Sequence, residues 1–139
     1  MSAKTFDEVE VGDLLEPLTL PPIDRLSLAL YCGGSNDHNP IHIDPDAAQS
    51  AGLDGVIAHG MLSMAFVGRL LTSWVEQRRV RKFSCRFVGM MMLGDVPMVS
   101  GEVAEKIQKD GENLVRLTLS LKDETGQEKV SAEALVAFS

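Results

Sequence analysis

One segment of the chain is apolar on almost every side but is too short to cross a membrane. It runs from Met61 to Val75, and Arg69 is its only charged residue. A helix that is hydrophobic all round must be covered by other protein segments, since a membrane-spanning helix needs about 20 apolar residues. The sequence therefore predicts a long helix that starts near His59 and Gly60 and is buried on nearly all sides.

The second half of the chain contains segments that can cover such a helix. Apolar and polar residues alternate with a period of two, which indicates half-buried strands, in residues 83–87, 115–121 and 130–136. Turn signals fall between these runs at Gly94-Asp95, Asp110-Gly111 and Thr125-Gly126. They favour consecutive antiparallel strands joined by short connections.

The first half of the chain predicts shorter elements. Residues 12–22 are expected to form an edge strand, because Pro17 removes one ladder donor. A short helix capped by Asp24 follows and is expected to end at Gly33-Gly34. The expected fold class is α+β, with a curved antiparallel sheet that includes the first strand and wraps around one buried helix. The length fits a single domain, residues 1–139.

Charge and cysteine content narrow the functional classes. The net charge of −7 and the pI of about 4.9 argue against nucleic acid held on a broad cationic surface. The basic run from Arg78 to Lys82 is expected to be a solvated helix end, with a local phosphate site as the alternative. Cys32 and Cys85 lack CxxC spacing and are expected to pack in the interior. Residues 1–4 lead into polar sequence without a signal peptide, so we expect a cytoplasmic protein with no membrane partner.

The loop of residues 35–44 carries the densest set of reactive groups. It places two imidazoles and two carboxylates around an Asn-Pro break. Pro40 disfavours helix at the preceding residue, so a turn followed by an extended piece is expected. In such a loop Asp37 and His42 could face one small volume. The alternative is that Asp37 and Asn39 serve only in local Asx turns.

A metal site is a second interpretation of this loop. His42 and Asp44 have the HxD spacing of a two-histidine, one-carboxylate site, and His59 could supply the third ligand. Asp44 is better explained as the N-cap of a short helix that begins at Pro45. We therefore expect no metal.

Gly60 stands where the long helix is expected to begin. The first N–H groups of a helix lack partners within the helix, and the positive end of the helix dipole favours negative charge. A residue without a side chain leaves room for a ligand there, so the N–H of Gly60 could stabilise an oxyanion. The alternative is that Gly60 only eases a tight entry into the helix.

These two motifs together resemble the signature of the MaoC-like hydratases, which are (R)-specific enoyl-thioester hydratases with a hot-dog fold. The matching residues are 36–45, with the sequence NDHNPIHIDP, and 52–62, with the sequence GLDGVIAHGML. The similarity extends from Val11 to Val75. Members usually have Gly where this chain has Asn36, and Asn tolerates positive φ better than most residues. The loop is therefore expected to keep its shape.

The resemblance implies a hydro-lyase that interconverts trans-2-enoyl and (R)-3-hydroxyacyl thioesters. It places the acid–base pair on Asp37 and His42, the oxyanion donor on Gly60 and the loop support on Asn39. The residues expected to contact the substrate are Asn39, His59, Met61, Ser63, Arg81 and Lys82. The implied substrate is carried by coenzyme A or by an acyl-carrier protein, and no cofactor is required. A dimer or higher oligomer is expected, built from identical or different hot-dog subunits.

Two other functions remain open from the sequence. One is a non-catalytic acyl-binding or partner subunit of a hot-dog heterodimer, against which the presence of both Asp37 and His42 argues. The other is a thioesterase, because a fold alone does not give a function. That activity would need a carboxylate aimed at C1 of the acyl group instead of C3.

Overall fold

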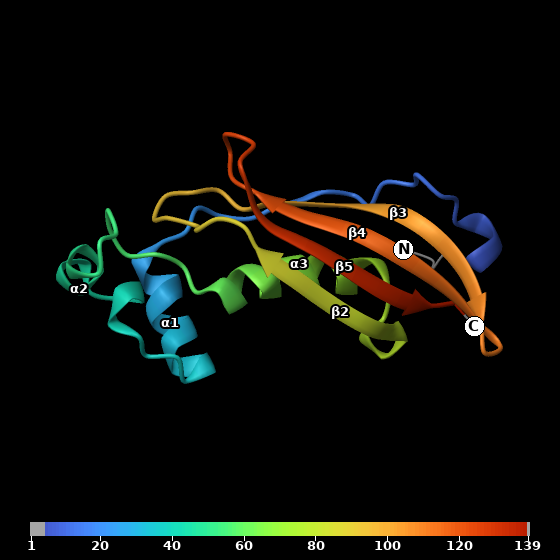
Figure 1. Ribbon diagram of the computed structural model, residues 1–139, viewed down its shortest axis with the longest axis horizontal. Helices are drawn as coiled ribbons and strands as arrows, with labels where there is room; N and C mark the ends of the chain where they lie inside the picture. Colours follow the sequence, from blue (N-terminus) through green and yellow to red (C-terminus); the bar gives the residue numbers. More distant parts are fainter. Residues whose placement is uncertain (1–4, 139) are drawn as a thin grey trace.

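The main element of the protein is an antiparallel sheet of five strands. The computed structural model describes residues 5–138; residues 1–4, on which the prediction of no signal peptide depends, lie outside the described residues. The strands are β1 (Leu18–Thr19), β2 (Val80–Phe87), β3 (Met98–Lys109), β4 (Glu112–Lys122) and β5 (Glu128–Ala137). Figure 1 shows that the sheet curves and that helix α3 (Gly60–Trp74) lies along it. The predicted α+β class is therefore confirmed.

The order of the strands differs from the prediction in one place. It is β1-β3-β4-β5-β2, so β4 and β5 are neighbours, as the turn signal between them predicted, and β3, for which the sequence shows no alternating run, pairs with β4. In contrast, β2 pairs with β5, and Phe83 lies opposite Ala134. Residues 88–97 therefore connect two strands that are not neighbours. The prediction that Gly94-Asp95 joins neighbouring strands by a short connection is wrong.

The first strand belongs to the same sheet, as predicted, but it is shorter than residues 12–22. Only Leu18–Thr19 forms a strand with β3, and Leu14 adds an isolated bridge to Glu102. Pro17 lies between these two pairings and cannot donate to a ladder. The proline that favoured an edge strand also limits its length.

One face of α3 forms the core against the sheet. Val67, Leu70 and Leu71 are buried, as are Leu117 and Leu119 of β4. These side chains belong to a single buried apolar cluster. Burial of this apolar surface is the main favourable contribution to the free energy of folding.

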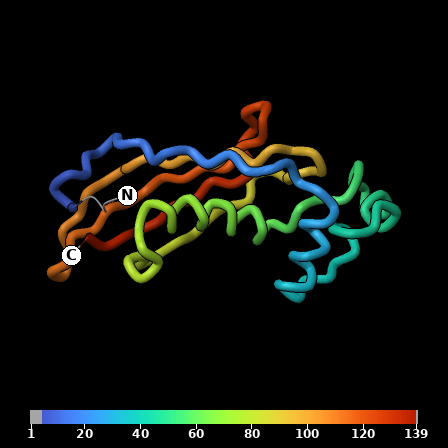
Figure 2. Tube along the Cα trace, turned by 180° about the vertical axis from the view of Figure 1, so that it is seen from behind, coloured from blue at the N-terminus to red at the C-terminus, as the bar shows by residue number. Residues whose placement is uncertain are grey.

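The opposite face of α3 is open, so the prediction of burial on nearly all sides is wrong for a single chain. Met61 is 56% exposed, and Ala65 and Arg69 are also exposed. Figure 2 shows α3 in front of the sheet, with no other segment over its outer side. The sheet curves around one side of the helix only. Within residues 5–138, no helix combines the length and the apolar character needed to cross a membrane.

Three short helices gather beyond one end of the sheet (Figure 1). They are α1 (Arg25–Ser35), the 3-10 helix η2 (Pro40–His42) and α2 (Pro45–Ser50). Gly33 and Gly34 lie inside α1, which corrects the predicted helix end, and Asn36 ends α1 in the left-handed region with a φ of 61°. Asn36 thus adopts the conformation that we expected it to tolerate. Residues 40–42 form a helical turn instead of an extended piece.

Two further 3-10 helices complete the described elements, η1 (Phe6–Glu8) and η3 (Gln77–Arg79). The basic run is therefore divided. Arg78 and Arg79 end the 3-10 helix η3, so the expected helix end is confirmed for these two residues, whereas Arg81 and Lys82 lie in β2. Arg79 lies over the ring of Phe138, with its guanidinium carbon 5.7 Å from the ring centre.

Candidate active site

Asp37, His42 and His59 come together at the N-terminal end of α3. Asp37 follows α1, His42 ends η2, and His59 is the N-cap residue of α3. One side-chain nitrogen or oxygen of each lies within 4.8 Å of those of the other two. Asp37 is exposed, whereas His42 and His59 are buried. The structure thus brings the predicted acid–base pair into one small volume, with one group open to solvent.

His42 is held by the main chain on one side of its ring. Its Nδ1 lies 2.7 Å from the carbonyl oxygen of Ile57. Because a carbonyl oxygen only accepts hydrogen bonds, Nδ1 must carry the proton in the neutral ring. The lone pair is then on Nε2. Nε2 is therefore the atom through which His42 can take up or release a proton.

Asp37 and Asn39 form the Asx turns that were the alternative interpretation of this loop. Oδ1 of Asp37 accepts a hydrogen bond from the N–H of Asn39 at 3.2 Å. Oδ1 of Asn39 accepts one from the N–H of Ile41, also at 3.2 Å. Within the described residues, Oδ2 of Asp37 has no such partner. The loop is therefore shaped by these turns while one carboxylate oxygen remains available for chemistry.

His59 contacts both catalytic candidates from the interior. Its ring stacks on the ring of His42, with centres 3.8 Å apart and planes at 23°. Its Nε2 lies 3.3 Å from the carbonyl oxygen of Asp37 and 3.4 Å from Sγ of Cys32. Burial lowers the pKa of His59 below its usual value. Cys32 is buried, as predicted, but it also contacts this histidine, and no pattern in the sequence indicates that contact.

Gly60 is the first residue of α3 and is exposed. The N–H groups of Leu62 and Ser63 both bond to the carbonyl oxygen of His59, at 3.1 and 3.2 Å. The N–H of Gly60 has no acceptor within residues 5–138. A Cβ at Gly60 would lie 3.3 Å from the ring of Phe87. The space above Gly60 is therefore narrow, and an unpaired N–H stands beside it.

The remaining predicted substrate contacts divide into two groups. Met61 is exposed beside Gly60, and Ser63 is buried one turn further along α3. Arg81 and Lys82 lie near the start of β2, six and five residues before Phe87, or about 20 and 17 Å along the strand. Arg81 forms a salt bridge of 2.8 Å with Glu112. The structure therefore does not bring the two cations to the cluster within one chain.

The geometry of the cluster is poorly suited to a metal ion. The lone pair of an imidazole nitrogen lies in the plane of its ring, so two rings stacked at 23° cannot both aim at one ion beside them. Asp44, the other candidate ligand, caps α2 by accepting a hydrogen bond from the N–H of Asp46 at 2.9 Å. Its role as an N-cap is thus confirmed.

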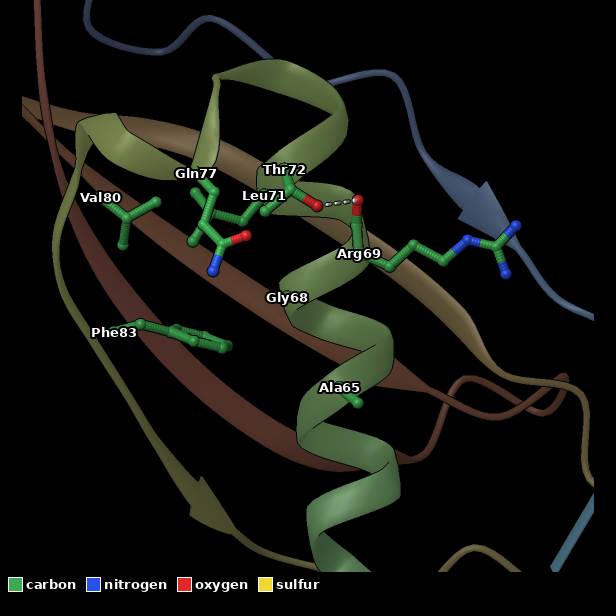
Figure 3. Close-up of a pocket in the computed structure, with 8 residues that line it drawn as sticks. All are labelled: Ala65, Gly68, Arg69, Leu71, Thr72, Gln77, Val80 and Phe83. Atoms are coloured by element: carbon green, nitrogen blue, oxygen red, sulfur yellow. Dashed lines mark hydrogen bonds between the residues drawn. The ribbon is translucent and has the colours of Figure 1, made fainter. Parts of the chain in front are cut away.

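A groove of about 500 Å³ runs along the open face of α3 (Figure 3). It is lined by Ala65, Gly68, Arg69, Leu71, Thr72, Gln77, Val80 and Phe83. The groove begins at Ala65, five residues after Gly60, and the ring of Phe83 lies across it from Gly68. The small side chains of α3 leave this space open beyond the cluster.

Residues 14–125 match a family model described as the MaoC like domain. The chain belongs to the MaoC-like family. Among relatives of this MaoC-like chain, the fatty acid synthase subunit beta of Aspergillus oryzae is 44% identical over 78 residues, which are 53% of this chain and 4% of that protein. The mitochondrial 3-hydroxyacyl-[acyl-carrier-protein] dehydratase of Arabidopsis thaliana is 28% identical over 95 residues, 68% of this chain and 55% of that protein. The chain thus spans only a small part of the fatty acid synthase subunits.

Two solved structures are similar to this MaoC-like chain over almost its whole length. The R-hydratase PhaJ1 of Pseudomonas aeruginosa is 30% identical with a TM-score of 0.82, over 96% of this chain and 84% of that one. The (R)-hydratase of A. caviae is 25% identical with a TM-score of 0.79, over 94% and 98% of the two chains. These similarities confirm the hot-dog fold that the resemblance implied.

Proposed function

We propose that this protein is a hydro-lyase that reversibly hydrates trans-2-enoyl thioesters to (R)-3-hydroxyacyl thioesters. The proposal depends on the Asp37 carboxylate and the His42 imidazole, which cluster at the start of α3, where the N–H of Gly60 is unpaired among the described residues. This arrangement offers an acid, a base and an oxyanion donor in one place. The names of the Arabidopsis, Pseudomonas and A. caviae relatives, one dehydratase and two (R)-hydratases, support the same reaction class.

The spacing of Asp37 and His42 suits a water molecule held between them. Their side-chain atoms lie within 4.8 Å, and no direct hydrogen bond joins them in the described residues. Two hydrogen bonds that meet at one water span roughly 4.5 Å. The water oxygen would add to C3 while one of its protons passes to the lone pair on Nε2 of His42, and Asp37 would accept a hydrogen bond from the other O–H of the water. Nε2 of His42 would then deliver the same proton to C2, which leaves both groups as they began.

The N–H of Gly60 would stabilise the thioester oxygen during this addition. As the bond to C3 forms, electrons move toward the carbonyl oxygen, which becomes enolate-like. A preorganised donor at a helix start favours that charge more than the neutral thioester. An interaction that is stronger in the transition state than with the bound substrate lowers the activation barrier and does not merely increase the affinity for the substrate.

The groove along α3 would take the acyl chain beyond C4. It begins one and a half turns from Gly60, and Leu71, Val80 and Phe83 give it apolar walls. The proposed contacts of Arg81 and Lys82 with carrier phosphates would then require a second copy, because both lie at the far end of β2.

We further propose that the single domain, residues 1–139, works as a dimer. The outer face of α3 is uncovered, and β2 ends the sheet with one edge unpaired among the described residues. A second copy or another hot-dog subunit could cover both. Light scattering on the purified protein at micromolar concentration should give about twice the mass of one chain, and a monomer would contradict the proposal.

The decisive experiment follows the absorbance of crotonyl-CoA and of longer trans-2-enoyl-CoAs when the purified protein is added. Loss of the enoyl absorbance with formation of the (R)-alcohol is the expected result. Release of free thiol would indicate a thioesterase. No change with any chain length, nor with enoyl-acyl-carrier protein, would favour a non-catalytic subunit.

A further inference from the structure

The mechanism above gives no role to His59, although it is among the most completely buried polar residues of the chain. It is 1% exposed, and its Nδ1 has no hydrogen-bond partner within residues 5–138. A buried polar atom without a partner costs about 1–3 kcal/mol. An apolar residue of similar size would avoid that cost, so the other contacts of His59 call for an explanation.

The contacts of His59 determine which of its nitrogens carries the proton. The carbonyl oxygen of Asp37 can only accept a hydrogen bond, so Nε2 must be the donor. Sγ of Cys32, on the other side of the same nitrogen, then shares this N–H as a weak acceptor. The lone pair is left on Nδ1. His42 has the opposite tautomer, because its own donor is Nδ1.

The surroundings of His59 keep the ring neutral. The titratable groups that face it are Tyr31 and Cys32 from α1, Asp37 from the following loop and His42 from η2. Burial is the largest influence on the pKa of His59 and lowers it, and the nearby imidazole of His42 acts in the same direction. The hydrogen bond to the main chain of Asp37 and the charge of its carboxylate raise this pKa, but the net shift is downward. A neutral ring is also the form that can stack closely on His42, which must itself gain and lose a proton.

We propose that His59 is a positioning residue for the hydration reaction, holding Asp37 and His42 in place without touching the substrate. The stack fixes the plane of the His42 ring, which is otherwise fixed by a single hydrogen bond to Ile57. His59 directly precedes α3, and its Nε2–H donates a hydrogen bond to the main-chain carbonyl oxygen of Asp37. This hydrogen bond holds the Asp37 loop against the start of α3. Cys32 supports the same nitrogen from α1. This role rests on the proposed function, and it differs from the substrate contact expected from the sequence.

Two substitutions separate the two contacts. His59→Phe keeps a flat ring that can stack on His42 but removes the hydrogen bond to Asp37. His59→Gln keeps an N–H donor but removes the stack. A displacement of about 1 Å in a catalytic group can cost 100-fold in rate, so we expect each variant to lose roughly 10- to 100-fold in kcat on crotonyl-CoA. KM should stay within a few-fold, because the substrate does not contact His59.

His38→Gln provides the matched control, since His38 is exposed and makes no hydrogen bond in the described residues. Its kcat and melting temperature should equal those of the wild type. If both His59 variants melt at lower temperature but keep the wild-type kcat per folded molecule, His59 is only a structural residue and the proposal is wrong. A large rise in KM with unchanged kcat would show that His59 contacts the substrate, and would also overturn it.

A second measurement does not depend on turnover. The chain has three histidines, so ¹⁵N NMR of histidine-labelled protein can report each tautomer. At pH 6.5, close to the ordinary pKa of a histidine, His59 should be neutral with its proton on Nε2. Half protonation of His59, or a proton on Nδ1, would refute the assignment. If the wild type fails to hydrate any enoyl thioester, the proposed function fails, and these spectra still decide whether His59 makes the contacts described.

Discussion

Replacing Gly60 with Ala tests the oxyanion donor without changing any charged side chain. The fold should tolerate the change. Gly60 lies in the first turn of α3 with a φ outside the left-handed region, so its backbone suits any residue. The new Cβ would lie 3.3 Å from two carbons of the Phe87 ring, but that ring is 48% exposed and can move by a few tenths of an ångström.

The expected effects on stability and on rate are therefore very different. Alanine favours a helix over glycine by up to about 1 kcal/mol, which opposes the tight contact with Phe87. The melting temperature should then stay within about 5 °C of the wild type. The methyl group would occupy the narrow space beside the N–H that the thioester oxygen needs. Loss of one oxyanion donor costs about 2.7–4 kcal/mol, or roughly 10²–10³ in kcat.

The assay measures kcat, KM and melting temperature on one preparation of each variant, with crotonyl-CoA as substrate. Gly34→Ala is the matched control, because Gly34 lies inside α1 and a Cβ there would meet nothing within 4 Å. It should keep full activity. A Gly60→Ala protein that is destabilised but turns over at the wild-type rate would show that the oxyanion donor lies elsewhere.

Other predictions test the rest of the site and one buried carboxylate, that of Asp123. Asp37→Asn and His42→Ala should each fold and lose at least about 100-fold in turnover; near-normal hydration by either would refute the acid–base pair. Gly68→Ala narrows the groove against Phe83, so turnover of eight-carbon enoyl-CoA should fall relative to crotonyl-CoA. Hydrogen bonds from Thr125 lower the pKa of Asp123. Its contribution to stability is therefore present above about pH 3.8 and is lost as the pH falls toward the folded-state pKa. Asp123→Asn should lower the melting temperature more at pH 7 than at pH 2.

Much of the fold could be predicted because its elements carry regular periodicities. The apolar run after Gly60 predicts α3, and the three runs of alternating apolar and polar residues predict β2, β4 and β5. Strand β3 was missed because Gly101 occupies a core-facing position, where a Cβ would lie 2.6 Å from a side-chain carbon of Leu119. A bulge between Val103 and Glu105 then shifts the alternation. Both features serve the packing of the sheet, and both hide the pattern of a strand.

The site was only partly predictable. Asp37, His42 and Gly60 could be proposed because they lie in two compact motifs. Cys32 and His59, which are in contact, are 27 positions apart in the sequence. No local sequence pattern predicts this contact. The open face of α3 shows a similar limit. The hydropathy of the α3 sequence indicates that other protein segments must pack on the helix. It does not indicate whether those segments belong to the same chain or to another chain.

The exposed edge of β2 also affects the protein before any partner is present. An unpaired strand edge is a template on which further chains can add and aggregate. Strand β2 carries Lys82 and Arg86, in addition to Arg81, which is paired with Glu112, so two such edges that meet with their cations opposite each other repel. Only a pairing that separates or neutralises these cations is favourable. These charges therefore disfavour arbitrary pairing of two β2 edges, and they restrict the registers in which a second chain could add to the sheet.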